Sequence, residues 1–184
     1  MIAATVTGVG GYLPPRVVSN KDIESVLETT DEWIQQRTGI QQRHWVTSES
    51  TSDLAFEAAK VAIKNAGIET QQIDLIILAT SSPDTDIPGA AAFLQAKLEL
   101  PGVPYFDIRQ ACSGFIYGMS LADHYIRSET YKCILLVGAE VQSKGLDRTP
   151  LGKNVSILFG DGAGAVIIQA TDSESMADDS RESK

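Results

Sequence analysis

One cysteine stands where the chain combines a nucleophile with the start of a helix. Cys112 lies between residues 103–108, predicted as a short buried strand, and residues 113–126, predicted as an amphipathic helix. In the first turn of a helix, unpaired N–H groups and the positive end of the dipole favour an anion such as a thiolate. Small neighbours would let a substrate approach closely: Ala111, Ser113, Gly114 and Gly118. The pattern equally fits an inert core cysteine, so both interpretations stay open.

Other chemistry-bearing residues are predicted to be structural. His124 follows Cys112 by 12 residues in the same predicted helix, which places it ~18 Å away along the axis and out of reach as a base. His44 lies beside a predicted strand, and Cys133 opens a buried one, which is typical of a core position. The run 160–162 (Gly-Asp-Gly) lacks the Lys-Ser/Thr of a phosphate loop and is predicted to be a tight turn.

The composition narrows the class of protein. The chain has 184 residues, 43% of them hydrophobic, and a formal net charge of −9, which is ordinary for a soluble globular domain. It has no basic run, so we expect no nucleic-acid partner. No apolar run is long enough to predict a membrane span. Two cysteines without metal-ligand spacing indicate a reducing, cytoplasmic environment and no metal site.

Apolar runs alternate with helical patterns along the chain, which predicts one α/β domain. Helices are expected from Asn20 as cap to Glu28, and from Thr30 as cap to Arg37 before a stop at Gly39. The other expected helices are 51–66, 88–98 and 113–126, and the expected strands are 2–9, 40–46, 74–80, 103–108, 133–139 and 164–170. The segment 155–159 is expected to precede the turn at 160–162. The domain is predicted to span residues 1–170, and the acidic stretch 171–184 is predicted to be a disordered tail or linker.

Four stretches occur in an order that resembles the β-ketoacyl-acyl-carrier-protein synthase III family of the thiolase-like superfamily. They are Thr30-Asp31-Glu32-Trp33-Ile34 with Arg37-Thr38-Gly39-Ile40, the run from Ala66-Gly67-Ile68 to Asp74-Leu75-Ile76, the segment 107–118 around Cys112, and Phe159-Gly160-Asp161-Gly162-Ala163-Gly164-Ala165. The resemblance covers residues 1 to about 170. It implies a thiolase-like half-domain: a mixed, mostly parallel five-stranded sheet with helices on its faces.

The resemblance also implies a reaction. Cys112 would take an acyl group from acyl-coenzyme A, and the thioester would be condensed with a carbanion formed by decarboxylation of malonyl-carrier protein or malonyl-CoA. Acyl-CoA is a substrate, and no further cofactor is implied. Two alternatives stay open: an acyltransferase that performs no condensation, and a non-catalytic partner subunit that would not be acylated.

The family's chains are about twice this long, so the resemblance identifies this chain as the N-terminal half. The other half supplies the histidine and asparagine of the site, and we expect either that half or another chain to complete it. A homodimer is also expected. Ile87 matches a position that reaches the partner subunit's acyl pocket; ordinary core packing is the alternative for this side chain.

The resemblance further predicts a coenzyme A site. Trp33 matches the position that stacks on the adenine, and Arg37 matches a nearby basic contact. Where the family carries an arginine against the adenine, this chain has Leu151. Arg148 and Lys153 are the candidates to replace it, and Lys153 is included in the predicted site.

Overall fold

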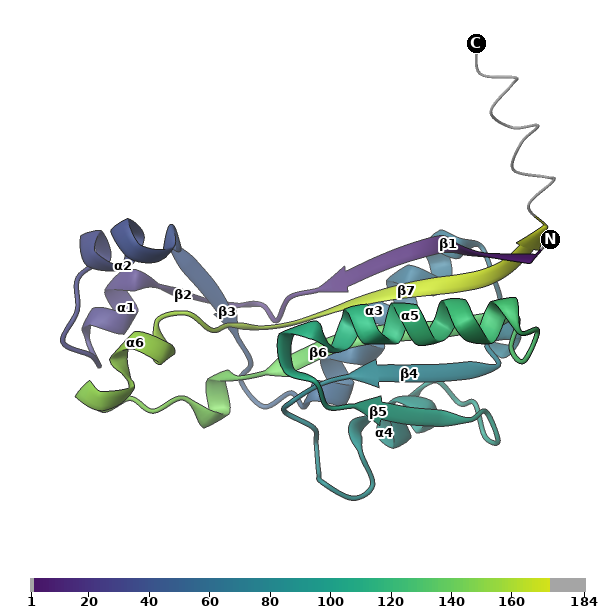
Figure 1. Cartoon of the computed structure of the whole chain (residues 1–184). Helices are drawn as coiled ribbons and strands as arrows, with labels where there is room; N and C mark the ends of the chain where they lie inside the picture. The colour runs from purple at the N-terminus through teal and green to yellow at the C-terminus, as the bar shows by residue number, and fades with distance from the viewer. Residues whose placement is uncertain (1, 173–184) are drawn as a thin grey trace, which may run out of the picture.

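A five-stranded sheet forms the centre of the computed structural model, which describes residues 2–172 (Figure 1). β4 is parallel to both β5 and β6, whereas β7 is antiparallel to both β6 and β1. Only β7 therefore runs against the other four strands, which confirms the predicted mixed, mostly parallel sheet. In spatial order the strands are β1 (Ile2–Tyr12), β7 (Asp161–Asp172), β6 (Cys133–Val141), β4 (Leu75–Ala79) and β5 (Tyr105–Ile108).

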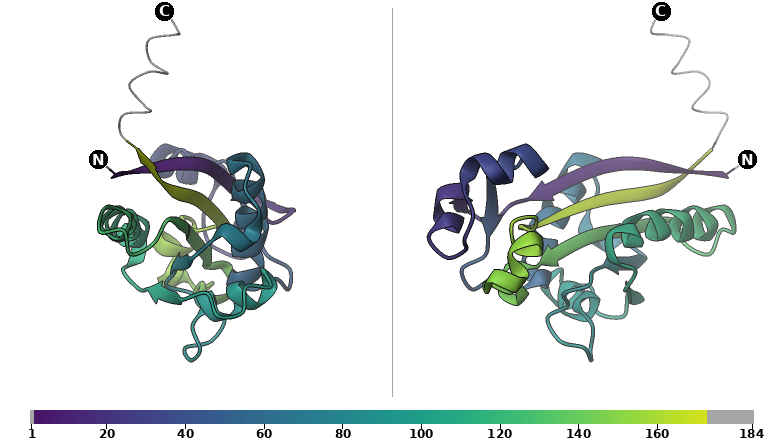
Figure 2. Two further views of the ribbon diagram at one scale, coloured as in Figure 1. Left: turned by 90° about the vertical axis from the view of Figure 1, so that its right-hand side faces the viewer. Right: turned by 60° about the vertical axis from the view of Figure 1, so that its left-hand side comes forward.

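Helices cover both faces of this sheet (Figure 2). α3 (Thr51–Ala66) and α4 (Ala90–Lys97) pack on one face, with Ile76 and Leu78 of β4 in their core. α5 (Gly114–Arg127) packs on the other face, with Leu75 and Ile77. All five residues of β4 are buried, because alternate side chains enter the two cores.

α3 has the predicted bounds because its ends carry strong local signals. Ser50 and Asp53 form a capping box, and Gly67 closes the helix with a φ of 67°. Lys97 of α4 donates to Asp53 at 2.8 Å. Partial burial acts to raise the pKa of Asp53, but the hydrogen bonds from Lys97 and Ser50 outweigh it and lower the pKa to about 2.

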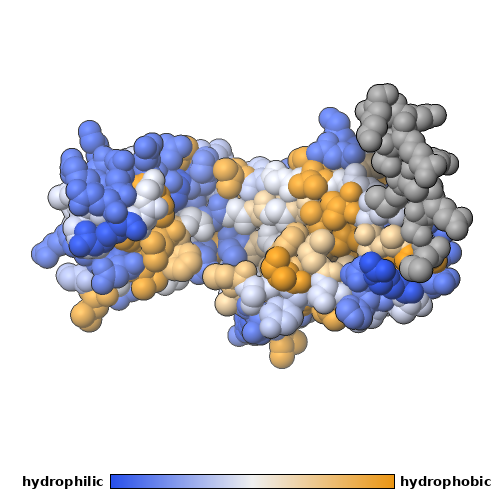
Figure 3. Space-filling view, turned by 45° about the horizontal axis from the view of Figure 1, so that its top comes forward, coloured by the Kyte–Doolittle hydropathy of each residue, from blue (hydrophilic) through white to orange (hydrophobic). Residues whose placement is uncertain are grey.

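α5 lies close to the sheet because two of its residues have no side chain. A Cβ on Gly118 would lie 2.4 Å from Cδ1 of Leu136, and one on Gly114 would lie 3.1 Å from Cβ of Ala79. Other residues of α5 expose apolar side chains: 68% of Ile116, 54% of Tyr117 and 38% of Leu121. Hydrophobic side chains gather on the surface of the larger, sheet-bearing part of the molecule (Figure 3).

A smaller part, here called the small lobe, lies beyond one end of the sheet, on the left in Figure 1. It consists of α1 (Asn20–Glu24), α2 (Asp31–Thr38), α6 (Lys153–Ser156) and a hairpin of β2 (Arg16–Ser19) with β3 (Gln42–Trp45). It has its own buried core of Val18, Ile23, Leu27, Ile34, Trp45 and Ile157. Single 3-10 turns connect the elements: Thr70–Gln72, Ala111–Ser113, Ser143–Gly145 and Pro150–Gly152.

Several predicted boundaries need correction. α1 ends at Glu24 and not at Glu28, and Ser19, not Asn20, is its cap, because the Asn20 amide is buried in contacts with other segments. The helix predicted over 88–98 begins at Ala90.

The end of the chain also differs from expectation. Residues 153–156 form α6, so the segment expected before the turn is partly helical. The turn predicted at 160–162 is wrong, since Asp161 and Gly162 already pair with β6. β7 runs on to Asp172, two residues into the predicted tail; residues 173–184 lie outside the described residues.

Candidate active site

Cys112 lies at the junction between β5 and α5, as predicted. It occupies the 3-10 turn Ala111–Ser113, which leads directly into α5. Ala111 has a φ of 45°, a left-handed conformation that is costly outside glycine. The Cys112 side chain is exposed, so the interpretation as a buried core cysteine does not apply to it.

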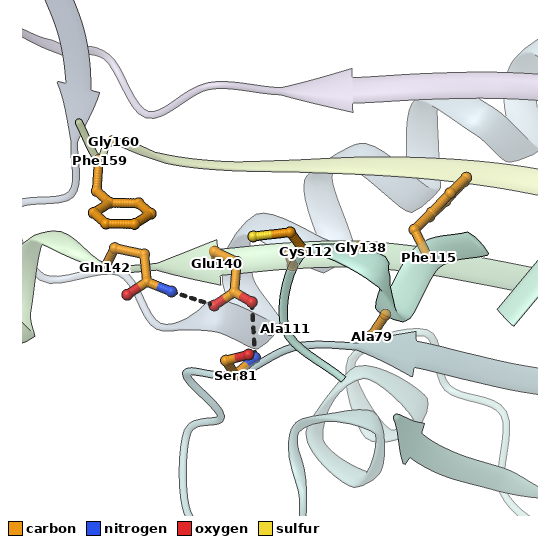
Figure 4. A pocket seen from close by; sticks show the side chains of 11 residues that line it. Ala79, Ser81, Ala111, Cys112, Phe115, Gly138, Glu140, Gln142, Phe159 and Gly160 are labelled. Atoms are coloured by element: carbon orange, nitrogen blue, oxygen red, sulfur yellow. Dashed lines mark hydrogen bonds between the residues drawn. The ribbon is translucent and has the colours of Figure 1, made fainter. Parts of the chain in front are cut away.

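A cavity of about 450 Å³ opens beside Cys112 at the carboxyl ends of β4 and β6 (Figure 4). The sulfur points toward the side of this cavity where Glu140 and Phe159 lie. Its lining is largely apolar, with Ala79, Phe115, Gly138 and Phe159 beside the polar Ser81, Glu140 and Gln142. The arrangement places a thiol at the wall of an apolar space, where a thioester with a hydrocarbon chain could bind.

Glu140 organises the polar wall of the cavity. Its carboxylate accepts hydrogen bonds from Ser81 N at 2.7 Å, from Gln142 Nε2 at 3.0 Å and from the Ser82 hydroxyl. Ser82 Oγ in turn accepts from Val141 N at 2.9 Å. These bonds tie the loop after β4 to the end of β6. Sequence reasoning missed Glu140; the available signal was an acidic residue near the end of an otherwise apolar strand.

Both histidines have structural contacts, as predicted. Nδ1 of His44 lies 2.6 Å from Pro14 O, and Nδ1 of His124 lies 2.7 Å from Ser120 O. No imidazole within residues 2–172 lines the Cys112 cavity. Within that range there is also no cluster of His, Cys, Asp and Glu side chains suited to a metal ion, and no helix long and apolar enough to cross a membrane.

Cys133 is a core residue, as predicted. It is 4% exposed, and burial, together with nearby Asp74, raises the pKa of its thiol to about 11. The protonated thiol is a poor nucleophile. Cys133 is therefore buried and protonated, whereas Cys112 is exposed.

Two charged residues just before Cys112 serve the scaffold. The Asp107 carboxylate accepts from Ala90 N at 2.7 Å and Ala91 N at 2.8 Å, which caps α4. Arg109 forms an exposed ion pair with Asp86 at 3.0 Å. Asp107 therefore holds the start of α4 against β5, and neither Asp107 nor Arg109 lines the Cys112 cavity.

A second cluster lies in the small lobe and contains the three residues of the predicted coenzyme A site, Trp33, Arg37 and Lys153. The Arg37 guanidinium lies 4.1 Å from the centroid of the Trp33 ring, and Lys153 Nζ lies 4.4 Å from it. We call this group the Trp33 clasp. Lys153, and not Leu151, contacts Trp33. The side chain of Leu151 is 93% exposed. None of the three lines the cavity beside Cys112.

Two other predicted residues lie apart from the clasp. Arg148 lies 5.3 Å from the ring of Trp45, so it is not the cation that contacts Trp33. Ile87 is 91% exposed in the loop before α4. Core packing is therefore the wrong interpretation for Ile87, and its predicted contact with a partner subunit stays untested.

Known proteins resemble the chain along almost its whole length. A family model for 3-oxoacyl-[acyl-carrier-protein (ACP)] synthase III matches residues 106–181. A β-ketoacyl-[acyl-carrier-protein] synthase III of Thioalkalivibrio sulfidiphilus is 46% identical over 95% of this chain and 54% of its own length. One of Staphylococcus haemolyticus is 51% identical over 89% and 52%. The chain spans about half the length of the curated relatives it matches.

Solved structures agree in fold. The crystal structure of 3-oxoacyl-[acyl-carrier-protein] synthase III from Aquifex aeolicus superimposes with a TM-score of 0.89 at 42% identity, over 92% of this chain and 54% of that one. The priming β-ketosynthase of the R1128 polyketide pathway superimposes with a TM-score of 0.87 at 32% identity, over 92% and 51%.

Proposed function

We propose that the chain is the N-terminal half of a condensing enzyme of the β-ketoacyl-acyl-carrier-protein synthase III family, which its similarity to members of that family supports. The observation that carries the proposal is the exposed thiol of Cys112, which stands at a helix start beside an apolar cavity of about 450 Å³.

In the proposed first step, Cys112 Sγ attacks the carbonyl carbon of an acyl-CoA thioester. A new carbon–sulfur bond forms to Cys112, the bond to coenzyme A breaks, and the thiol proton passes through solvent to the leaving thiolate. The Cys112 N–H at the start of α5 can donate to the developing oxyanion. The apolar lining of the cavity would receive the acyl chain, and a covalent intermediate predicts ping-pong kinetics.

The Trp33 clasp is the proposed site for the nucleotide end of the acyl donor. An indole face can stack on an adenine, and the cations of Arg37 and Lys153 can bind the phosphates of coenzyme A. Their positions around one ring support this assignment. Acyl-CoA is a substrate in this proposal, which requires no other cofactor.

The second step would be condensation with a malonyl thioester on CoA or on acyl carrier protein. Residues 2–172 place no imidazole at the cavity, so we assign the histidine and asparagine of this step to a second half or a complementary chain. The apolar residues exposed on α5 are the proposed contact for that half, since such surfaces mark interaction sites. A homodimer, in which Ile87 reaches the partner's acyl pocket, and a cytoplasmic location complete the proposal.

A non-condensing acyltransferase is the second candidate. The exposed thiol of Cys112 supports it as well, because acyl transfer needs only a nucleophile and an oxyanion hole. Measuring carbon dioxide release from a malonyl thioester distinguishes the two reactions. A non-catalytic partner subunit fits less well, since it would not require the exposed thiol of Cys112.

The test is intact-mass spectrometry after incubation with a panel of acyl-CoA donors, followed by peptide mapping. We expect one acyl adduct, confined to the peptide that contains Cys112 and absent from a Cys112→Ala variant. An adduct that persists in this variant would refute the assignment. So would a folded chain that takes no acyl group when its complementary half is supplied.

A further inference from the structure

A buried arginine without an acidic partner connects the elements of the small lobe. Arg43 of β3 is 6% exposed, and no carboxylate within residues 2–172 forms an ion pair with it. Burial lowers the pKa of its guanidinium, but an arginine stays charged in a protein. A buried cation is costly unless hydrogen bonds satisfy it. The segments that supply the acceptor oxygens are therefore the ones that Arg43 holds together.

Those oxygens come from three segments. Nη1 donates to Asn20 Oδ1 at 2.9 Å and to Val18 O at 3.4 Å, and Nη2 donates to Ile157 O at 3.0 Å. Ile157 directly follows α6 and lies 114 residues from Arg43 in sequence. Arg43 therefore connects β3 with the end of β2, the start of α1 and the end of α6.

Asn20 extends this network to α2. Its side-chain amide donates to Asp31 Oδ1 and to Ile40 O, both at 2.7 Å. Asp31 opens α2, and Ile40 follows its cap, Gly39. The Arg43–Asn20 pair thus holds both ends of α2 on one side and α6 on the other.

The two sides of the Trp33 clasp depend on these elements. Arg37 lies on the same helix as Trp33, four residues further on, so α2 alone brings them together. Lys153 belongs to α6, which has only four residues and cannot be stable by itself. Its place beside Trp33 needs tertiary contacts, and the bond from Arg43 to Ile157 O is one of them.

We propose that Arg43 is a positioning residue for the acyl donor. It acts through Asn20 and Ile157, which hold α2 and α6 so that Lys153 stays beside Trp33. This inference rests on the proposed role of the Trp33 clasp as the nucleotide site. Arg43 itself is buried, so its proposed effect on the acyl donor is indirect.

The test separates nucleotide binding from reaction at the thiol. Calorimetry measures the Kd of coenzyme A, and mass spectrometry measures acylation of Cys112 by acyl-CoA and by the matching N-acetylcysteamine thioester, which lacks the nucleotide. For Arg43→Met, we expect the Kd and the KM for acyl-CoA to rise ~10-fold, while acylation by the short thioester stays within about twofold. Arg127→Met is the matched control, since Arg127 is an exposed arginine of α5 paired with Asp123.

Each outcome decides the question. Unchanged coenzyme A binding in a folded Arg43→Met chain overturns the inference, and so does an equal loss with both thioesters, which would indicate general collapse. If Arg43→Met does not fold, Asn20→Ala breaks the same network and must show the same selective loss. A wild-type chain that binds coenzyme A but is not acylated, even when its complementary half is supplied, would refute the proposed nucleophile and leave the positioning role standing. A wild-type chain that does not bind coenzyme A would overturn the inference.

Discussion

Replacing Asp161 by alanine should destabilise the protein strongly, although this residue lies in a segment that looks like an ordinary glycine-rich turn. Asp161 is 4% exposed. Its carboxylate accepts hydrogen bonds from Val46 N at 2.7 Å and from Ser143 N at 2.8 Å, both buried. It thereby fixes the start of β7 against the end of β3 and the segment after β6.

The size of the effect follows from the two N–H groups left without an acceptor. Each buried, unsatisfied donor costs about 1–3 kcal/mol, so the two together should lower the free energy of unfolding of Asp161→Ala by roughly 2–6 kcal/mol. A domain of this size usually has about 5–15 kcal/mol in total. With about 2–4 °C per kcal/mol, the Tm should fall by roughly 4–24 °C. Asp161→Asn keeps one acceptor oxygen and should lose about half as much free energy.

Urea and thermal unfolding followed by circular dichroism measure these values. Asp123→Ala is the control, because this exposed carboxylate forms only a helical pair with Arg127, and its loss should change stability by less than about 1 kcal/mol. If Asp161→Ala loses no more than this control with an unchanged urea m-value, the assignment of Asp161 as a buried clamp is refuted.

Three further predictions concern the two candidate sites and α3. Lys153→Ala should weaken coenzyme A binding about 5–10-fold in calorimetry, because it removes a cation. Leu151→Ala is the control and should have no effect, since the side chain that it removes is 93% exposed. Equal effects of the two substitutions would contradict the placement of Lys153. Iodoacetamide at neutral pH should label Cys112 alone in the folded chain, because Cys133 is buried with a pKa of about 11, and should label both cysteines in urea. Asp53→Ala should be less stable than the wild type above about pH 4, and this difference in the free energy of unfolding should disappear as the pH falls toward 2. The reason is that the pKa of Asp53 drops from its usual value of 3.8 to about 2 on folding. A difference that is independent of pH would rule out the ion pair as its cause.

Features set by neighbouring residues could be predicted from the sequence. The bounds of α3 follow from the Ser50 cap and from Gly67. The placement of Cys112 follows from the change of apolar pattern between β5 and α5. The burial of β4 follows from its continuous apolar run. Each of these signals lies within a few residues of the feature it predicts.

Features that depend on distant contacts could not be predicted. The sequence predicts a turn at Asp161 and not a buried carboxylate, because its partner Val46 lies 115 residues away. Glu140 gained its role only when folding brought Ser81 beside it. The resemblance places Leu151 where the family has an arginine and leaves Arg148 and Lys153 as candidates to replace that arginine. Only the folded structure shows that Lys153 lies beside Trp33 and Arg148 beside Trp45. The small lobe was missed as a unit because its core combines segments more than 100 residues apart.

The pairing of β1 with β7 has a consequence for how the protein folds during synthesis. Ile2 pairs with Asp172, so the first and last strands of the described chain are neighbours in the sheet. β1 cannot find this partner until the ribosome has released β7, and it must wait while nearly every other element is made. Contacts of such long sequence separation slow folding, and an unpaired strand edge invites association with other chains. The sheet is therefore completed last at the edge that was synthesised first.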